Sequence, residues 1–307
     1  MGGGVRTSFG GDVSPNDLLR KASSEEQRAA YQANINSYFQ DLLADYNNRN
    51  IEQINSHLDT IESALTSEKI GSVSLIYGGS IKKRTYVDGL SDVDILAIID
   101  DTTLVSAPPH QVLEYFANRL KERLPNTEIT IGNLAATVKF SDGHEIQVLP
   151  AISTSTGIRI SNADGTDWSG VIRPDKFANK LTNVNQSISK KMVPVIKLYK
   201  AINMRLPKED KLSGYHIESL AINAFENYQG SLSYKDMLLH LTQYASTAVM
   251  NPIEDSTGQS IHVDDYLGDP ASHERKRASA AIERIAARMK SADSAASVEK
   301  WKELFGE

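Results

Sequence analysis

The sequence predicts a mixed α/β fold in which a sheet of about five strands is followed by a mostly helical C-terminal lobe. Short runs rich in apolar and β-branched residues, bounded by glycine, asparagine and aspartate, are typical of strands. Apolar residues at steps of three and four, on both sides of these runs, indicate amphipathic helices. With 307 residues and 40% hydrophobic content, the chain can bury the core of one large or two packed domains.

Two helices are predicted before the sheet. The residues before them, 1–24, are rich in glycine, serine and other polar types, so we expect a loose lead-in there. A further helix, around residues 109–124, is expected to cover the sheet. The apolar stripes of the first two helices are Tyr31, Ile35, Tyr38, Leu42 and Tyr46, and Ile51, Ile54, Leu58, Ile61 and Leu65.

The strands of the predicted sheet are separated by turn-forming dipeptides and tripeptides. After a polar loop at residues 161–170, the pattern becomes helical. We therefore expect a lead-in at 1–24, a catalytic core with its N-terminal helices at 25–165, and a helical lobe at 166–307. The strand-like runs are residues 73–77, 92–99, 128–131, 134–140 and 145–149.

Composition and charge exclude several classes of protein. The net charge of −6 argues against a large nucleic-acid-binding surface. With no cysteine, the chain can form neither disulfides nor thiolate zinc sites. No apolar run approaches the length of a membrane span, and residues 1–6 lack the apolar core of a signal peptide, so we expect a cytoplasmic protein with no membrane partner.

Two short motifs at the first two strands carry the chemistry. Gly78 and Gly79 follow the first strand, where backbone amides without a neighbouring Cβ can turn toward a triphosphate, and the Ser80 hydroxyl adds a donor. Asp92 and Asp94, two apart on the second strand, are expected to point to the same side. Paired carboxylates suit two Mg²⁺ or Mn²⁺ ions, which polarise an α-phosphate and stabilise the attacking and leaving oxygens.

An isolated Asp-x-Asp is most often a solvated turn. Here an apolar run follows Asp94, and acidic residues at the start of a buried strand are costly unless they are used or paired. Gly-Gly-Ser followed after eleven residues by Asp-x-Asp therefore indicates a metal-dependent nucleotidyltransferase site.

This combination resembles the DNA polymerase β-like nucleotidyltransferase superfamily. Within it, the chain is similar to the branch that holds oligoadenylate synthase, cyclic GMP-AMP synthase and the bacterial CD-NTases of antiphage defence, over roughly residues 60–270. The resemblance implies a polymerase β-like core, nucleoside triphosphates such as ATP as substrates, and a downstream effector that senses the product.

The third catalytic position departs from the pattern. In oligoadenylate synthases it is a carboxylate just before a Val-Leu-Pro-Ala run, and here it is Gln147, a weaker Mg²⁺ ligand that cannot accept a proton. Glu145 faces the same side about 6–7 Å away along the strand. Three alternatives stay open: Glu145 or Gln147 completes a working site, the third carboxylate comes from elsewhere, or activity is weak or missing.

The helical lobe supplies candidate nucleotide-binding residues. Lys197 and Lys200 lie three residues apart, beside an apolar helical stripe. They either belong to a solvated helix face or supply two ammonium groups that hold a triphosphate. Ser213 can open a helix that has Tyr215 in its first turn, where the ring either closes the helix entry or stacks a base. The resemblance implies phosphate contacts for the lysines and base stacking for the tyrosine.

The function implied by the resemblance is the synthesis of a cyclic or linear nucleotide second messenger in antiphage defence. Three alternatives remain at this point. One is DNA oligomer synthesis from deoxynucleoside triphosphates, as in the Hailong defence enzymes. Another is a toxin-like nucleotidyltransferase that modifies tRNA or protein, and the third is an inactive nucleotide-binding module, which Gln147 motivates.

Overall fold

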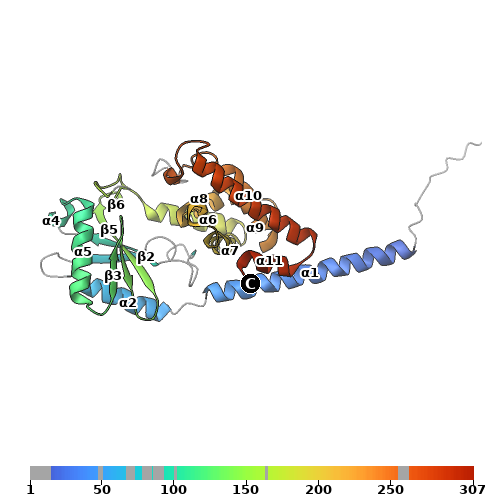
Figure 1. The fold of residues 1–307 in the computed structure, drawn as a ribbon, viewed down its shortest axis with the longest axis horizontal. Helices are drawn as coiled ribbons and strands as arrows, with labels where there is room; N and C mark the ends of the chain where they lie inside the picture. Colours follow the sequence, from blue (N-terminus) through green and yellow to red (C-terminus); the bar gives the residue numbers. More distant parts are fainter. Residues whose placement is uncertain are drawn as a thin grey trace, which may run out of the picture.

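A computed structural model describes residues 15–47, 51–66, 73–77, 85, 93–99, 102–162, 165–254 and 263–307. Figure 1 shows two lobes side by side: a sheet lobe on the left and a helical lobe on the right, with one long helix running along the second lobe. The predicted fold class, a mixed sheet followed by helices, is confirmed.

The described part of the sheet has six strands in the order β1-β2-β5-β4-β3, and β6 pairs with β5 off this path. β2 and β5 are parallel, and the other described pairs are antiparallel, so the sheet is mixed. β6 was not expected, because its four residues, Gly-Ile-Arg-Ile, are too short a run to give a clear periodic signal. The strands are Val73–Tyr77 (β1), Val93–Ile99 (β2), Glu128–Ile131 (β3), Ala136–Lys139 (β4), Glu145–Thr154 (β5) and Gly157–Ile160 (β6).

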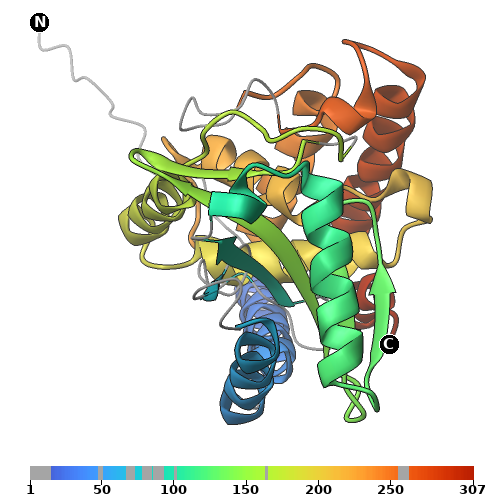
Figure 2. The same ribbon diagram turned by 90° about the vertical axis from the view of Figure 1, so that its left-hand side faces the viewer.

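Two helices, α2 (Ile51–Leu65) and α5 (Pro109–Arg123), cover one face of the sheet. Figure 2 shows α5 crossing in front of the strands. Ile95, Ala97 and Ile99 of β2 bury against these helices, whereas Leu96 and Ile98 pack on the opposite face, so β2 is apolar on both sides as expected for a strand between two layers. The short helix α4 (Thr102–Val105) follows β2.

The long helix α1 spans Pro15–Asn47 and therefore begins inside the stretch where we expected a loose lead-in. Proline suits the first helical position, because its missing amide would have no partner there. The buried face of α1 packs into the core of the helical lobe: Phe39 meets Trp301 edge to face, with ring centroids 5.5 Å apart. From the sequence, we grouped α1 with the catalytic core. An apolar helical stripe indicates that one face of the helix is buried, but it does not indicate which part of the protein covers that face.

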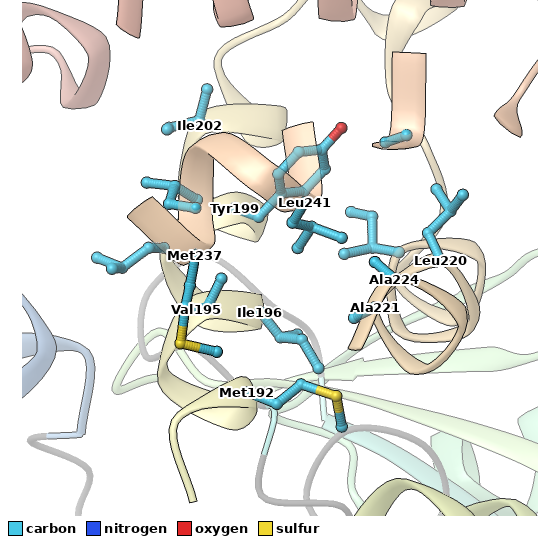
Figure 3. Packing of buried hydrophobic residues seen from close by; sticks show 14 of the residues in the cluster. Met192, Val195, Ile196, Tyr199, Ile202, Leu220, Ala221, Ala224, Met237 and Leu241 are labelled. Carbon is cyan, nitrogen blue, oxygen red and sulfur yellow. The ribbon is translucent and has the colours of Figure 1, made fainter. Parts of the chain in front are cut away.

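The helical lobe is built around α7. Ten of the thirteen residues of this helix are buried, including two lysines and an asparagine. Figure 3 shows Ile196 and Tyr199 of α7 packed among apolar side chains of the neighbouring helices. A helix buried on all sides must find partners inside the protein for its polar groups. The helices are α6 (Pro174–Ser187), α7 (Met192–Met204), α8 (Gly214–Phe225), α9 (Tyr234–Ala248), α10 (His273–Ser294) and α11 (Val298–Phe305), with 3₁₀ turns η1 (Lys208–Asp210) and η2 (Asp265–Leu267).

Among the helices that the structure describes, none combines the length and apolarity needed to span a membrane.

Candidate active site

The segment that carries the two sequence motifs connects β1 to β2, and the chain leaves β1 and enters β2 at the same end of the sheet. β1 ends at Tyr77, and Tyr77 is paired with Ile95 near the start of the antiparallel strand β2. The chain therefore departs toward the glycine motif and returns from the first aspartate of the second motif at the same end of the sheet. Gly78, Gly79, Ser80 and Asp92 themselves lie outside the described residues.

The strand register decides which residue lies beside Asp94. In the parallel pair β2–β5, Asp94 is directly abreast of Gln147, and Gln147 is abreast of Thr137 on the other side. Neighbouring strands are about 4.8 Å apart, so position 147 is within reach of a group bound at position 94. The register therefore places Gln147 beside Asp94, and its assignment to the third catalytic position stays a prediction.

Glu145 is engaged elsewhere. It lies directly opposite Lys139 on β4, and the Lys139 ammonium contacts Oε1 of Glu145 at 3.0 Å in an exposed pair. An exposed pair of this kind is weak, so the distinction between the two candidates rests on the register: Glu145 lies two residues along the strand from Gln147, the residue abreast of Asp94.

Lys200 of α7 lies in a buried polar cluster with Glu218 of α8 and Thr85. Its ammonium donates to Oε1 of Glu218 at 2.8 Å and to the carbonyl and hydroxyl oxygens of Thr85 at 3.2 and 3.3 Å. The Thr85 hydroxyl also donates to Oε1 of Glu218. Because all three residues are buried, the carboxylate neutralises a cation that would otherwise be costly in the interior.

This cluster ties the helical lobe to the segment between the two motifs. Thr85 comes after Ser80 and before Asp92 in the sequence, and it is fully buried. The first turn of α8 also approaches the cluster, since a Cβ added at Gly214 would lie 3.5 Å from Nζ of Lys200. The structure therefore brings Lys200 and the α8 N-terminus close to Thr85, whereas the contact of Lys200 with phosphate stays a prediction.

Lys197, one turn earlier on α7, makes a different contact. It is buried and its ammonium donates to the side-chain oxygen of Asn47, the last residue of α1. A cation at the carboxyl end of a helix is stabilised by the helix dipole. Lys197 thus joins α7 to the end of α1, and its role in binding phosphate stays a prediction.

The first turn of α8 presents the other two nucleotide-binding candidates. Ser213 caps this helix, its hydroxyl accepting from the amide of His216 at 3.2 Å. Tyr215 is one of the exposed large side chains, and its ring centroid lies 4.6 Å from that of Phe177 on α6. The first turn of α8 thus presents an accessible aromatic ring supported by a second ring, which suits base stacking.

A hydrogen-bonded network connects this turn to a buried ion pair, running from the exposed Ser213 and Tyr266 to the buried His216, Asp264 and Arg275. The Ser213 amide donates to the Tyr266 hydroxyl at 3.0 Å, and that hydroxyl lies 2.9 Å from Nδ1 of His216. Nε2 of His216 is 3.7 Å from Oδ2 of Asp264, which also accepts from Arg275 at 2.6 Å. Tyr266 therefore links the α8 cap to the buried ion pair, and it fixes the position of the turn that carries Tyr215.

His216 is the titratable group of this network. Burial lowers its pKa to about 4, with Asp264 acting in the opposite direction and Arg275 in the same one. At neutral pH the ring is uncharged, so Nδ1 can accept the proton of the Tyr266 hydroxyl.

The depressed pKa predicts acid sensitivity of the fold. The unfolded chain takes up a proton on His216 near its ordinary pKa of 6.5, whereas the folded chain does so only near 4. The contribution to the free energy of unfolding is therefore fully present above pH 6.5 and is lost as the pH falls toward 4, by up to about 3 kcal/mol. Urea unfolding at pH 7.5, 6 and 5 measures it. In His216→Gln, whose amide can still accept from Tyr266, the decline over this window should be shallower, and an equal decline would contradict the assignment.

Sequence reasoning missed Thr85 and Tyr266, and it did not pair Glu218 with Lys200. Thr85 and Glu218 are 133 residues apart. The available signal was the pair of lysines on an otherwise apolar helix, because a buried lysine requires an acidic partner somewhere in the chain.

Comparison with known proteins agrees with this architecture. The model of the Second Messenger Oligonucleotide or Dinucleotide Synthetase (SMODS) domain matches residues 34–185. No curated protein sequence matches the chain.

Three solved structures share the fold. CdnE cyclic dinucleotide synthase of Elizabethkingia meningoseptica, with GTP and Apcpp, has a TM-score of 0.59 at 18% identity and covers 75% of this chain and 90% of its own. CdnC of Escherichia coli with ATP has a TM-score of 0.61 at 18% identity, covering 92% and 97%. The CD-NTase CdnG of Bradyrhizobium diazoefficiens with GTP has a TM-score of 0.63 at 12% identity, covering 80% and 86%.

Proposed function

We propose that the protein is a template-independent nucleotidyltransferase that makes a cyclic or linear oligonucleotide messenger from nucleoside triphosphates such as ATP, because residues 34–185 match the model of the SMODS domain of second-messenger synthetases. The observation that supports this most is the edge where β1 ends and β2 begins. There, Gln147 lies abreast of Asp94, and the buried cluster of Lys200 joins the segment between the motifs to the α8 turn that carries Tyr215.

Asp92 and Asp94 are the proposed metal ligands. Two carboxylates two residues apart in the sequence, with Gln147 abreast of the second by strand register, would supply hard oxygen donors of the kind that fits Mg²⁺ or Mn²⁺. Two such ions, when bound, polarise the α-phosphate and stabilise the attacking and leaving oxygens.

The other proposed residues bind and orient the donor nucleotide. The amides of Gly78 and Gly79 and the Ser80 hydroxyl would hold the triphosphate, and Tyr215 would stack its base beside Ser213. A hydroxyl of the acceptor nucleotide then forms a bond to the α-phosphorus, the bond to the β-phosphate oxygen breaks, and pyrophosphate leaves in line. The hydroxyl proton passes to a carboxylate or to water, since Gln147 cannot accept it.

Lys197 and Lys200 are proposed to raise the positive potential near the donor phosphates. Glu218 already neutralises Lys200 in this structure, so we expect its larger contribution to be the position of the α8 turn. The proposed setting is antiphage defence in the cytoplasm, with a downstream effector that senses the product. The resemblance to bacterial CD-NTases supports this setting.

The proposal is tested by analysis of the products. The purified protein is incubated with each labelled ribo- and deoxyribonucleoside triphosphate, singly and mixed, and products are resolved before and after nuclease and phosphatase treatment. Products that phosphatase leaves intact and nuclease cleaves indicate a cyclic messenger, and deoxynucleotide products indicate DNA oligomer synthesis. Incorporation only when tRNA or protein is added would instead support the toxin-like alternative.

A catalytically silent nucleotide-binding module is the second candidate, because Gln147 replaces a carboxylate at the third position. It predicts binding of ATP without release of pyrophosphate.

The strand register predicts how the third position responds to substitution. Gln147→Ala should lower the rate of product formation by about tenfold or more, because it removes the oxygen beside Asp94, whereas Glu145→Ala should change it by less than about threefold. Gln147→Asp, which restores a carboxylate, should equal or exceed the unsubstituted rate. The measurement is the initial rate at saturating triphosphate. A large loss in Glu145→Ala with no loss in Gln147→Ala would assign the third position to Glu145.

A further inference from the structure

A cluster of two histidines and one aspartate lies outside the proposed active site. His57 comes from α2, and Asp142 and His144 come from the turn between β4 and β5. Nε2 of His57 lies 2.7 Å from Oδ2 of Asp142, and Nδ1 of His144 lies 3.2 Å from Oδ1 of the same carboxylate. The three candidate ligand atoms all lie within 4.8 Å of one another.

We propose that this cluster binds one Zn²⁺ ion, or a similar first-row divalent cation. Two imidazole nitrogens and a carboxylate oxygen form a donor set that suits zinc and is poorly suited to Mg²⁺. In a tetrahedral zinc site, the bond lengths place neighbouring ligand atoms about 3.3 Å apart. The two separations, 2.7 Å to Oδ2 and 3.2 Å to Oδ1 of Asp142, are shorter than this value and involve different carboxylate oxygens, so side-chain rotations would have to bring one oxygen and both nitrogens onto a single ion. A water molecule can fill the fourth position.

The ligands are already oriented toward one another. Oδ1 of Asp142 accepts from the backbone amide of His144 at 3.1 Å, which fixes the turn, and the Gln53 amide donates to Oδ2. The His57 ring stacks on Phe140, with ring centroids 3.7 Å apart and an angle of 15°. These contacts hold two ligands from distant parts of the chain in place before a metal arrives.

Among the described residues, one candidate ligand atom of the cluster has no hydrogen-bond partner. Nδ1 of His144 is buried and makes no hydrogen bond within the described structure, so its lone pair is available to a cation.

The alternative is a metal-free polar cluster in which His57 donates to Asp142 and closes the turn against α2. The two interpretations differ in what they predict for the stability of the sheet lobe. A bound ion would cross-link α2 to the turn that leads directly into Glu145 and Gln147, and so would stabilise the strand beside the proposed active site.

The experiment measures zinc binding to the full chain. Purified protein is stripped with a chelator, dialysed against Zn²⁺ with excess Mg²⁺ to saturate the paired aspartates, and assayed by elemental analysis and isothermal titration. We expect one zinc per chain and a rise in Tm on zinc addition. His57→Gln and His144→Gln should each weaken binding at least about tenfold and lose the Tm rise. Their zinc-free Tm, compared with that of the unsubstituted protein, shows whether they fold.

Two further variants serve as controls. His110→Gln alters an exposed histidine of α5 that is not part of the cluster, and it should bind zinc as the unsubstituted protein does. Asp92→Asn/Asp94→Asn should also retain the zinc. No stoichiometric zinc in the unsubstituted protein, unchanged binding in both histidine variants, or loss of zinc in the double aspartate variant would each overturn the proposal. These outcomes do not depend on nucleotidyl transfer.

Discussion

The double variant Asp92→Asn/Asp94→Asn is expected to lose about three orders of magnitude in the rate of pyrophosphate release, about 4 kcal/mol of transition-state stabilisation. The amides keep the size of the carboxylates but bind divalent cations far more weakly. The rate is measured with saturating ATP or a mixture of triphosphates and Mg²⁺.

A matched control separates loss of chemistry from loss of fold. Asp101→Asn also removes a carboxylate two residues after β2 ends, and we expect it to retain the rate. The double variant should keep the circular dichroism spectrum and Tm of the unsubstituted protein within a few degrees. A folded double variant with a full rate would show that Asp92 and Asp94 do not hold the catalytic metal.

Glu218→Ala is expected to lower the free energy of unfolding by about 3–5 kcal/mol, because it leaves the buried ammonium of Lys200 without the carboxylate that neutralises it. Chemical denaturation at pH 7.5 measures the change. Because Lys200 contacts Thr85 between the two motifs, activity should fall together with stability.

The double variant Lys200→Met/Glu218→Leu tests whether the loss of stability in Glu218→Ala comes from the unpaired buried charge of Lys200. Removing both charges together leaves no buried ion, so the unfolding free energy should recover to within about 1–2 kcal/mol of the unsubstituted protein. Activity should stay low if Lys200 acts on the donor nucleotide. A loss of less than about 1 kcal/mol in Glu218→Ala would contradict the buried pairing.

Local patterns predicted the elements of the sheet lobe well. The run at 128–131 became β3 with the same bounds, and the run at 145–149 became the first half of β5. Apolar stripes placed α2 and the helix at 109–124 because they report burial of one face directly. β6 was missed, since an alternation over only four residues is too short to distinguish a strand from a loop.

Contacts between distant segments could not be predicted from one sequence. The apolar stripe of α1 could be recognised in the sequence, but its packing partner, the core of the helical lobe, could not. The same limit applies to Lys200, which the sequence offered as a phosphate contact and which the structure pairs with Glu218 and Thr85. A residue type and its spacing constrain local chemistry, whereas the choice among possible partners depends on the tertiary fold.

The register of β2 and β5 is the clearest gain from the structure for the site. From sequence, Glu145 and Gln147 were both open as the third catalytic residue. The pairing of Asp94 with Gln147 favours Gln147 for the position beside Asp94.

The most direct test of the proposed nucleotidyl transfer is pyrophosphate release by the purified protein with a mixture of the four ribonucleoside triphosphates, measured with Mg²⁺, with Mn²⁺ and with chelator. We predict release that requires the metal and that accompanies formation of an oligonucleotide product. Binding of ATP with no pyrophosphate above the chelated control, under either metal and with the deoxynucleotides as well, would contradict synthesis and leave a nucleotide-binding module.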